Sequence, residues 1–102
     1  MVLAEFSMFP TDKGESVSPY VSQIIDFIDK SGISYQLTPM GTVLEGSWDD
    51  VMLVITNCFK ILEPQADRVY SNIKIDYRNT VESRMKSKIN KIETILNKSV
   101  QK

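Results

Sequence analysis

The chain has 102 residues, a formal net charge of −1 and 42% hydrophobic residues, a composition typical of one soluble domain spanning 1–102. It contains no histidine, one cysteine and four glycines, so histidine-dependent nucleophilic catalysis, histidine zinc sites, an internal disulfide and glycine-rich phosphate loops are excluded. We therefore expect neither catalytic residues nor a metal site.

The first half of the chain begins with a strand and a helix. Residues 2–9 alternate in side-chain character, which predicts a strand with one wholly apolar face. Ser18 followed by Pro19 is typical of a helix N-cap and first helical position. The apolar spacing that follows predicts a helix over 18–31, which ends at Gly32 in a left-handed cap.

A hairpin and a second helix come next. Residues 33–38 are strand-like, 39–41 (Pro-Met-Gly) form a tight turn, and 42–46 form a short returning strand. A near capping box that begins at Ser47 precedes apolar residues at helical spacing. This pattern predicts a helix over 48–62.

The C-terminal part predicts one more strand and one more helix. Residues 67–77 alternate along their length. Asn79 and Glu82 are spaced as a capping box, and an apolar stripe follows them. We therefore expect a third helix over about 80–98.

This order of elements predicts an α+β fold: a ferredoxin-like βαββαβ antiparallel sheet with an additional C-terminal helix. Right-handed crossovers place the first two helices on one sheet face. That face should receive the apolar strand residues Phe6, Met8, Tyr35, Leu37, Ile73 and Ile75. Little room remains there for the third helix, so we expect its stripe to pack at the sheet edge or across a subunit boundary.

The opposite sheet face should be polar but weakly charged. Its expected residues are Glu5, Ser7, Phe9, Ser34, Gln36, Thr38, Tyr70, Asn72, Lys74 and Asp76. The pairing register decides whether Glu45, or instead Thr42 and Leu44, joins them, because a one-residue slip exchanges the faces. Such a surface suits a second copy of the chain, with a small polar heterocycle enclosed between the sheets. A plainly solvated or dimer-burying face is the alternative interpretation.

Several segments resemble one family. They are Ser16–Val21, Ser31–Tyr35, Thr38–Gly46, Arg68–Val69 and Ile73–Arg78, of which the Pro-Met-Gly-Thr…Glu-Gly hairpin is the most specific. In this order they resemble the small thiamine-binding (YkoF-like) proteins. The resemblance implies a ferredoxin-like subunit that pairs through its sheet into a homodimer or homotetramer. It also implies binding of thiamine or its hydroxymethylpyrimidine moiety, with no known catalytic step and no further cofactor.

The hairpin supplies most of the candidate ligand-binding residues. Glu45 would accept hydrogen bonds from an exocyclic amine or balance a thiazolium cation; otherwise it is an exposed strand-end acid. Thr38 and Thr42 would bond ring nitrogens or, alternatively, the turn's own backbone. Met40, next to Gly41 at the turn, would lie on a ring or form a dimer contact.

Four further candidates lie outside the hairpin. Ser7 faces the open side, and Phe9 would stack on a ligand or pack in an interface. Ser18 would hold an anion at the helix N-terminus or simply cap it. Asn57 would face either ligand or solvent. The lone Cys58 falls in an apolar stripe and is expected to be buried and inert.

The charge distribution bears on partners. Residues 1–63 hold nine acidic and three basic side chains, whereas 64–102 hold four and nine. Because no aromatic residues interleave with these bases, we expect a solvated basic helix facing acidic protein surface and no nucleic-acid partner. No apolar run reaches the ~20 residues of a membrane span, and Met1–Glu5 lacks a signal peptide's basic flank, so a cytoplasmic protein without membrane contact is expected.

These observations favour a non-enzymatic binding protein for thiamine or its hydroxymethylpyrimidine moiety, held at the sheet and subunit interface. The alternative is an oligomeric, ACT-like regulatory or structural module whose partner is a protein.

Overall fold

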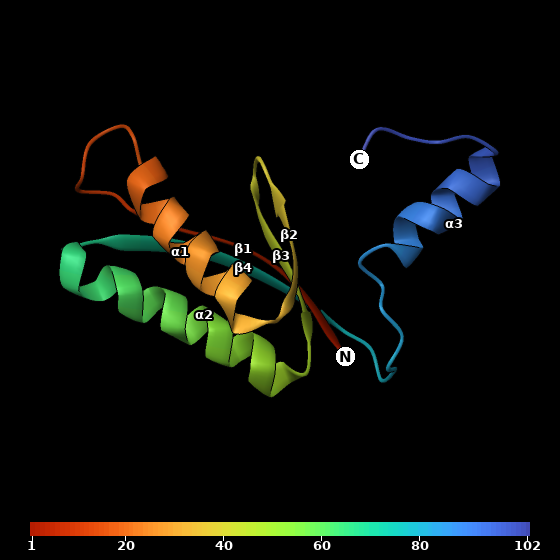
Figure 1. The fold of residues 1–102 in the computed structure, drawn as a ribbon, viewed down its shortest axis with the longest axis horizontal. Coiled ribbons are helices and arrows are strands. Elements are labelled where there is room, and N and C mark those ends of the chain that lie inside the picture. Colours follow the sequence, from red (N-terminus) through yellow and green to blue (C-terminus); the bar gives the residue numbers. More distant parts are fainter.

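The computed structural model describes residues 1–102, and Figure 1 shows a sheet with two helices on one face and a third helix that stands away from it. The elements are β1 (Val2–Pro10), α1 (Ser18–Ser31), β2 (Ser34–Thr38), β3 (Gly41–Gly46), α2 (Trp48–Leu62), a 3-10 turn (Glu63–Gln65), β4 (Val69–Tyr77) and α3 (Ser87–Leu96).

The four strands form one antiparallel sheet in the order β2-β3-β1-β4. β1 therefore lies between β3 and β4, and β2 and β4 are the edge strands. This arrangement confirms the predicted α+β, ferredoxin-like βαββαβ fold with an additional C-terminal helix.

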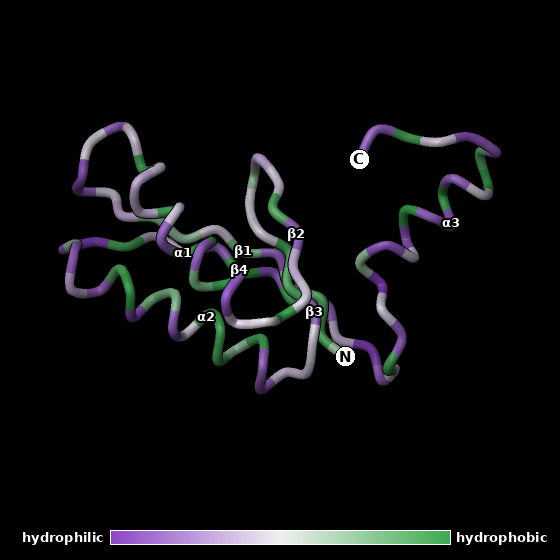
Figure 2. The backbone as a smooth tube through the Cα atoms, in the orientation of Figure 1, coloured by the Kyte–Doolittle hydropathy of each residue, from purple (hydrophilic) through white to green (hydrophobic).

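The core lies between the sheet and the first two helices. β1 alternates strictly, with Val2, Ala4, Phe6 and Met8 at 0–5% exposure and the residues between them half-exposed. Both helices pack on β1, and α2 also packs on β3. Figure 2 shows hydrophobic chain segments gathered where the central strands run beneath these helices. Burial of this apolar face makes the main favourable contribution to the folding free energy of the sheet.

The helices cover the edge strands only partly. Ile73 and Ile75 lie opposite Phe6 and Ala4 on the helix side, as predicted. Their exposures are nevertheless 41% and 38%, and that of Leu37 on β2 is 56%. The sequence pattern correctly placed these residues on that face, but their position at the sheet edges leaves them less covered than the residues of β1.

The second helix has the predicted bounds. The Ser47 side chain accepts a hydrogen bond from the Asp50 backbone N–H at 3.1 Å, which caps its first turn. Val51, Cys58 and Leu62 are each 0% exposed and form its inner face.

The predicted cap of the first helix is wrong. Val17, not Ser18, is the N-cap, and no side chain caps this end. The Val17 carbonyl accepts hydrogen bonds from Tyr20 and Val21, both at 3.0 Å, so the helix already includes Ser18. The predicted C-terminal end is confirmed, because Gly32 adopts the left-handed conformation at φ 81°.

The third helix is shorter than predicted. It begins at Ser87 rather than near residue 80, and the predicted Asn79–Glu82 capping box does not form. The Glu82 N–H instead bonds the Thr80 hydroxyl at 3.1 Å. The backbone N–H groups of Arg84 and Met85 donate to a side chain of β3, as described below. They therefore cannot donate to the carbonyl groups four residues earlier, as a helix that begins near residue 80 would require.

No residue of α3 is buried, and Ile92, Ile95 and Leu96 are 51%, 81% and 50% exposed. Figure 1 shows α3 to one side of the sheet. Ile89 at the start of its apolar stripe is partly buried and lines a groove with Tyr35 of β2, so only the later part of the stripe is left uncovered by this chain. None of the helices has the length and apolar content needed to cross a membrane.

Candidate functional site

A pocket of about 360 Å³ lies between α1, the end of β1 and the tip of the β2–β3 hairpin. Its walls include six of the nine residues predicted to bind a ligand: Ser7, Phe9, Thr38, Met40, Gly41 and Thr42. The fold therefore brings most of the candidate residues together from segments that are distant in sequence. We call this cavity the hairpin pocket.

The hairpin pocket exists because β3 leaves β1 early. The β1–β3 pairing ends at Phe6–Thr42, whereas β1 continues to Pro10 paired only with β4. The edge of β1 that faces away from β4 thus borders the pocket along Ser7–Phe9. Figure 1 shows the hairpin rising away from β1 and β4. Unpaired backbone groups on such an edge can donate to or accept from a guest molecule.

The tip of the hairpin is held by its own hydrogen bonds. The Thr38 hydroxyl donates to the Gly41 carbonyl at 2.8 Å and accepts from the Met40 and Gly41 N–H groups at 3.3 and 3.1 Å. Its proton is therefore used within the turn, the alternative role considered for this threonine. The Met40 side chain is 86% exposed at the tip.

Gly41 allows the hairpin to lie close to β1. A Cβ atom at this position would lie 2.9 Å from the Phe6 carbonyl oxygen, which is shorter than real contacts of this kind. Only glycine fits this approach without a backbone shift. The residue thus shapes the pocket through its missing side chain.

Two hydroxyl groups of the hairpin pocket have no hydrogen-bond partner within the chain. Thr42 lies on the helix-covered face and is only 5% exposed, whereas Ser7 lies on the open face opposite Asn72. Both line the pocket. A hydroxyl that lines a pocket without a partner in the chain can both donate to and accept from a bound molecule, so these two groups are suited to hydrogen-bonding a ligand.

The remaining wall is apolar and was not anticipated. The N-cap residue Val17 lines the hairpin pocket, together with Val21, Ile24 and Ile25 of α1. The sequence showed their helical spacing, but that spacing alone does not distinguish a core face from a pocket wall. No charged residue lines the pocket.

Phe9 also belongs to an aromatic pair at the end of the sheet. Its ring centroid lies 5.7 Å from that of Tyr70, with the planes tilted by 42°. Tyr70 is 47% exposed. The pair gives the open face an apolar end beside the pocket.

Three predicted site residues lie elsewhere. Ser18 is the residue after Val17, but its side chain does not line the hairpin pocket. Asn57 lines a separate groove between the end of α1 and α2. Glu45 pairs with Leu3 and Ser34, so it lies on the open face, and Thr42 and Leu44 lie on the other. It is at the end of β3 opposite to the hairpin pocket.

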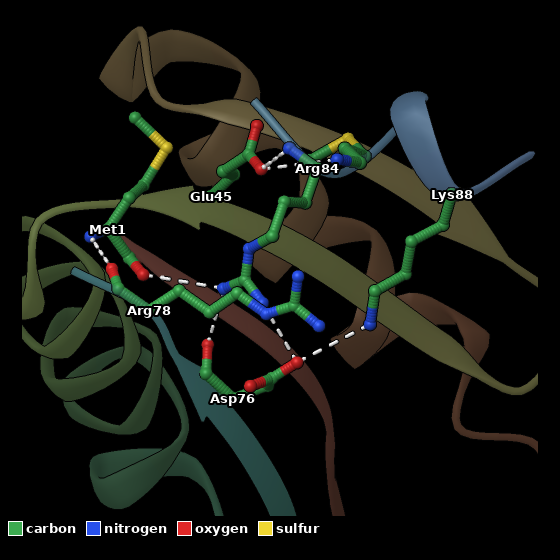
Figure 3. Close-up of polar contacts among 7 residues, drawn as sticks. Met1, Glu45, Asp76, Arg78, Arg84 and Lys88 are labelled. Atoms are coloured by element: carbon green, nitrogen blue, oxygen red, sulfur yellow. Dashed lines mark hydrogen bonds and ion pairs between the residues drawn. The ribbon is translucent and has the colours of Figure 1, made fainter. Parts of the chain in front are cut away.

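Glu45 is engaged by the C-terminal segment and is 5% exposed. Its carboxylate accepts hydrogen bonds from the Ser83 hydroxyl at 2.5 Å and from the Arg84 and Met85 N–H groups at 2.6 and 3.1 Å. Figure 3 shows this contact above the Arg84 side chain. The carboxylate thus anchors residues 83–85 to the sheet, a role that local sequence patterns do not reveal.

Neighbouring charges surround Asp76 at the same end of the sheet. The Arg84 guanidinium lies 2.8 Å from its Oδ2 atom, and the Lys88 ammonium lies 3.4 Å from the same atom. These contacts, chiefly the hydrogen bond from Lys88, lower the pKa of Asp76.

The lone thiol, that of Cys58, lines neither the hairpin pocket nor the region around Glu45 and Asp76. Cys58 is 0% exposed in α2, and burial raises the pKa of its thiol to about 12. It is therefore the buried residue that was expected rather than an activated nucleophile. No group of three or more histidine, cysteine or carboxylate side chains is placed to hold a metal ion.

The chain is similar in sequence to known proteins. The sequence profile of the family described as thiamine-binding protein matches residues 4–93. A UPF0045 protein of Methanocaldococcus jannaschii is 38% identical over 90 residues, covering 84% of this chain and 90% of its own. A UPF0045 protein of Mycobacterium tuberculosis is 35% identical over 96 residues, covering 93% and 94%.

Solved structures show the same fold. The crystal structure of a hypothetical protein from M. jannaschii superimposes with a TM-score of 0.81 at 36% identity, covering 89% of this chain and 94% of that one. A putative thiamine biosynthesis or salvage protein from Thermotoga maritima gives a TM-score of 0.77 at 22% identity, covering 89% and 97%, which shows a common fold. Given the profile match over most of its length and relatives above 30% identity, the chain belongs to the thiamine-binding protein family.

Proposed function

We propose that this protein binds thiamine or its hydroxymethylpyrimidine moiety without a catalytic step, and that the pyrimidine occupies the hairpin pocket. The observation that carries the proposal is the Thr42 hydroxyl, which belongs to a residue only 5% exposed, lines the pocket and has no partner within the chain. Membership of the thiamine-binding family supports it.

The character of the hairpin pocket suits an aminopyrimidine ring. Its volume of about 360 Å³ lies within the range of roughly 300–1,000 Å³ that is usual for small-molecule sites. Apolar α1 side chains would cover the ring faces, and the Ser7 and Thr42 hydroxyls with the β1 edge would meet its nitrogen atoms. Because no charged residue lines the pocket, a neutral pyrimidine fits it better than a thiazolium cation, which would point outward.

A second copy of the chain is the proposed partner. Ser7 and Phe9 lie on the open sheet face, which α1 and α2 leave uncovered. Pairing of two such faces would close the outer side of the site, next to the Phe9–Tyr70 pair. We propose that this homo-oligomer, a dimer or tetramer, is the binding form and acts as a carrier, buffer or sensor.

Calorimetric titration with thiamine and with hydroxymethylpyrimidine tests the proposal directly. Thr42→Val keeps the shape of the side chain and removes the hydroxyl, so we expect affinity to fall by about fivefold to tenfold, the usual value of one neutral hydrogen bond. Thr94→Val on α3 is the matched control and should bind as the unaltered protein does. Absence of heat for both ligands at millimolar concentration would refute the proposal.

One observation favours the alternative of a protein-interaction module. The apolar residues Ile92, Ile95 and Leu96 of α3 are exposed and unpartnered in this chain. Capture of one stoichiometric protein partner, lost when Ile95 is replaced by Asp, together with no thiamine binding, would select that function.

A further inference from the structure

A second, chemically different groove lies at the other end of the sheet. It has a volume of about 560 Å³ and lies between the segment after β4 and the first half of α3. Its basic lining residues are Arg78, Arg84, Lys88 and Lys91. We call it the basic groove; it lies near Met1, whereas the hairpin pocket lies at the far end of β1.

Arg84 forms a fixed cation in the wall of this groove. Its side chain is only 6% exposed. One terminal nitrogen donates to the Asp76 carboxylate at 2.8 Å, and the other donates to the Asp76 carbonyl at 2.7 Å and the Met1 carbonyl at 3.4 Å. The Nε–H group is buried without a partner. The guanidinium is therefore held in place with its donors incompletely satisfied.

The positive charge of the basic groove exceeds its negative charge. Asp76 is shared by Arg84 and Lys88. The side chains of Arg78 and Lys91 make no hydrogen bond or ion pair, and Glu82 is the only acidic residue that lines the groove. Arg78 and Arg84 line the same groove, and both side chains are drawn in Figure 3. Like charges that line one groove repel each other, and the single carboxylate of Asp76 is already shared by Arg84 and Lys88, so a further anion would reduce this repulsion.

The start of α3 adds to this potential. The helix has no side-chain cap at its N-terminus and no acidic residue in its first turn. Ser87, its first residue, lines the basic groove. The Glu45 carboxylate accepts from the Arg84 and Met85 N–H groups just before the helix, and the Lys88 N–H donates to the Arg84 carbonyl at 3.4 Å. No hydrogen bond to the backbone N–H of Ser87 is present, so this group and the partial positive charge of the helix end remain for an anion.

We propose that the basic groove binds the phosphate group of a small anion, either inorganic phosphate or a phosphate monoester. Arg78 and Lys91 supply mobile charged donors, Arg84 supplies the fixed charge beneath them, and Ser87 with the α3 N-terminus supplies neutral donors. This site is separate from the hairpin pocket and does not depend on the proposed thiamine binding.

Titration at constant ionic strength tests the site, with inorganic phosphate in one arm and phenyl phosphate in the other. We expect one saturable site per chain, weakened at least tenfold in the double variant Arg78→Gln/Lys91→Gln. These side chains make no contacts that the fold needs. The double variant Lys13→Gln/Lys60→Gln removes the same charge far from the groove and should change affinity by less than twofold.

The two arms distinguish the source of the phosphate. Tighter binding of phenyl phosphate would identify an ester as the ligand, and tighter binding of inorganic phosphate would identify the free anion; either supports the site. Absence of saturable binding in both arms, or equal weakening in both double variants, would overturn it. The Arg78→Gln/Lys91→Gln variant keeps Ser7 and Thr42, so a thiamine titration on the same sample reports the other proposal separately.

Discussion

The carboxylate of Glu45 accepts a hydrogen bond of 2.6 Å from the backbone N–H of Arg84, 39 residues further along the chain. Through this contact β3 determines where the C-terminal segment lies, and thereby where α3 begins. The same segment brings the Arg84 side chain to Asp76 and forms one wall of the basic groove.

Replacement of Glu45 should release this segment. Glu45→Ala leaves the N–H groups of Arg84 and Met85 without acceptors, so we expect the free energy of unfolding to fall by about 2–4 kcal/mol. Hydrogen exchange of these two amides should accelerate more than that of β1 amides. Glu15→Ala, in an exposed loop, is the control. Unchanged protection of Arg84 and Met85 would contradict this role.

Gly41 and Gly46, at the two ends of β3, should respond differently to a methyl group. Gly41→Ala places Cβ 2.9 Å from the Phe6 carbonyl oxygen, so we expect a loss of about 1–3 kcal/mol of stability in urea unfolding. In Gly46→Ala the nearest atom, Val51 Cγ2, is 3.7 Å away, an ordinary contact. This variant should lose less than about 1 kcal/mol. Equal losses would show that the close approach at the hairpin does not matter.

The C-terminal tail should be sensitive to acid. The hydrogen bond from Lys102 to Glu93, supported by that from the Val100 N–H, lowers the pKa of Glu93 from 4.5 to about 2. A lowered folded-state pKa means that the tail contact stabilises fully above about pH 4.5 and is lost as the pH falls towards 2. NMR titration of the Glu93 carboxyl carbon should show the low midpoint.

Lys102→Gln provides the comparison for this titration. Without the ammonium group, the midpoint of Glu93 should move up towards its ordinary value, because the largest cause of the shift is removed. A midpoint near 4.5 in the unaltered protein would mean that the tail is not bound to α3.

Cys58 should resist modification in the folded protein. With a pKa of about 12, the thiolate fraction at pH 8 is about a thousandfold lower than for an ordinary thiol, and the residue is 0% exposed. Labelling by a thiol reagent should therefore follow unfolding in urea. Rapid labelling without denaturant would show that α2 opens easily.

Some features of this protein follow from local sequence patterns, and others depend on contacts between distant residues. The order of strands and helices, the bounds of α2 and the inward face of β1 followed from the sequence, because repeats of 2.0 and 3.6 residues and the Ser47 cap are local signals. The hairpin segment also indicated most of the pocket residues. Its alternation could not decide between Glu45 and Thr42 as open-face residues.

By itself, then, the sequence determined which elements form, their ferredoxin-like order, and the family signature carried by the Pro39–Gly46 hairpin. The tertiary structure decided which face of the sheet Thr42 and Glu45 occupy, where β3 separates from β1 to leave the hairpin pocket, and where α3 starts. These features depend on pairing register and on hydrogen bonds between distant residues, such as Glu45 and Arg84. No local periodicity records such contacts, since they form only once the sheet is assembled.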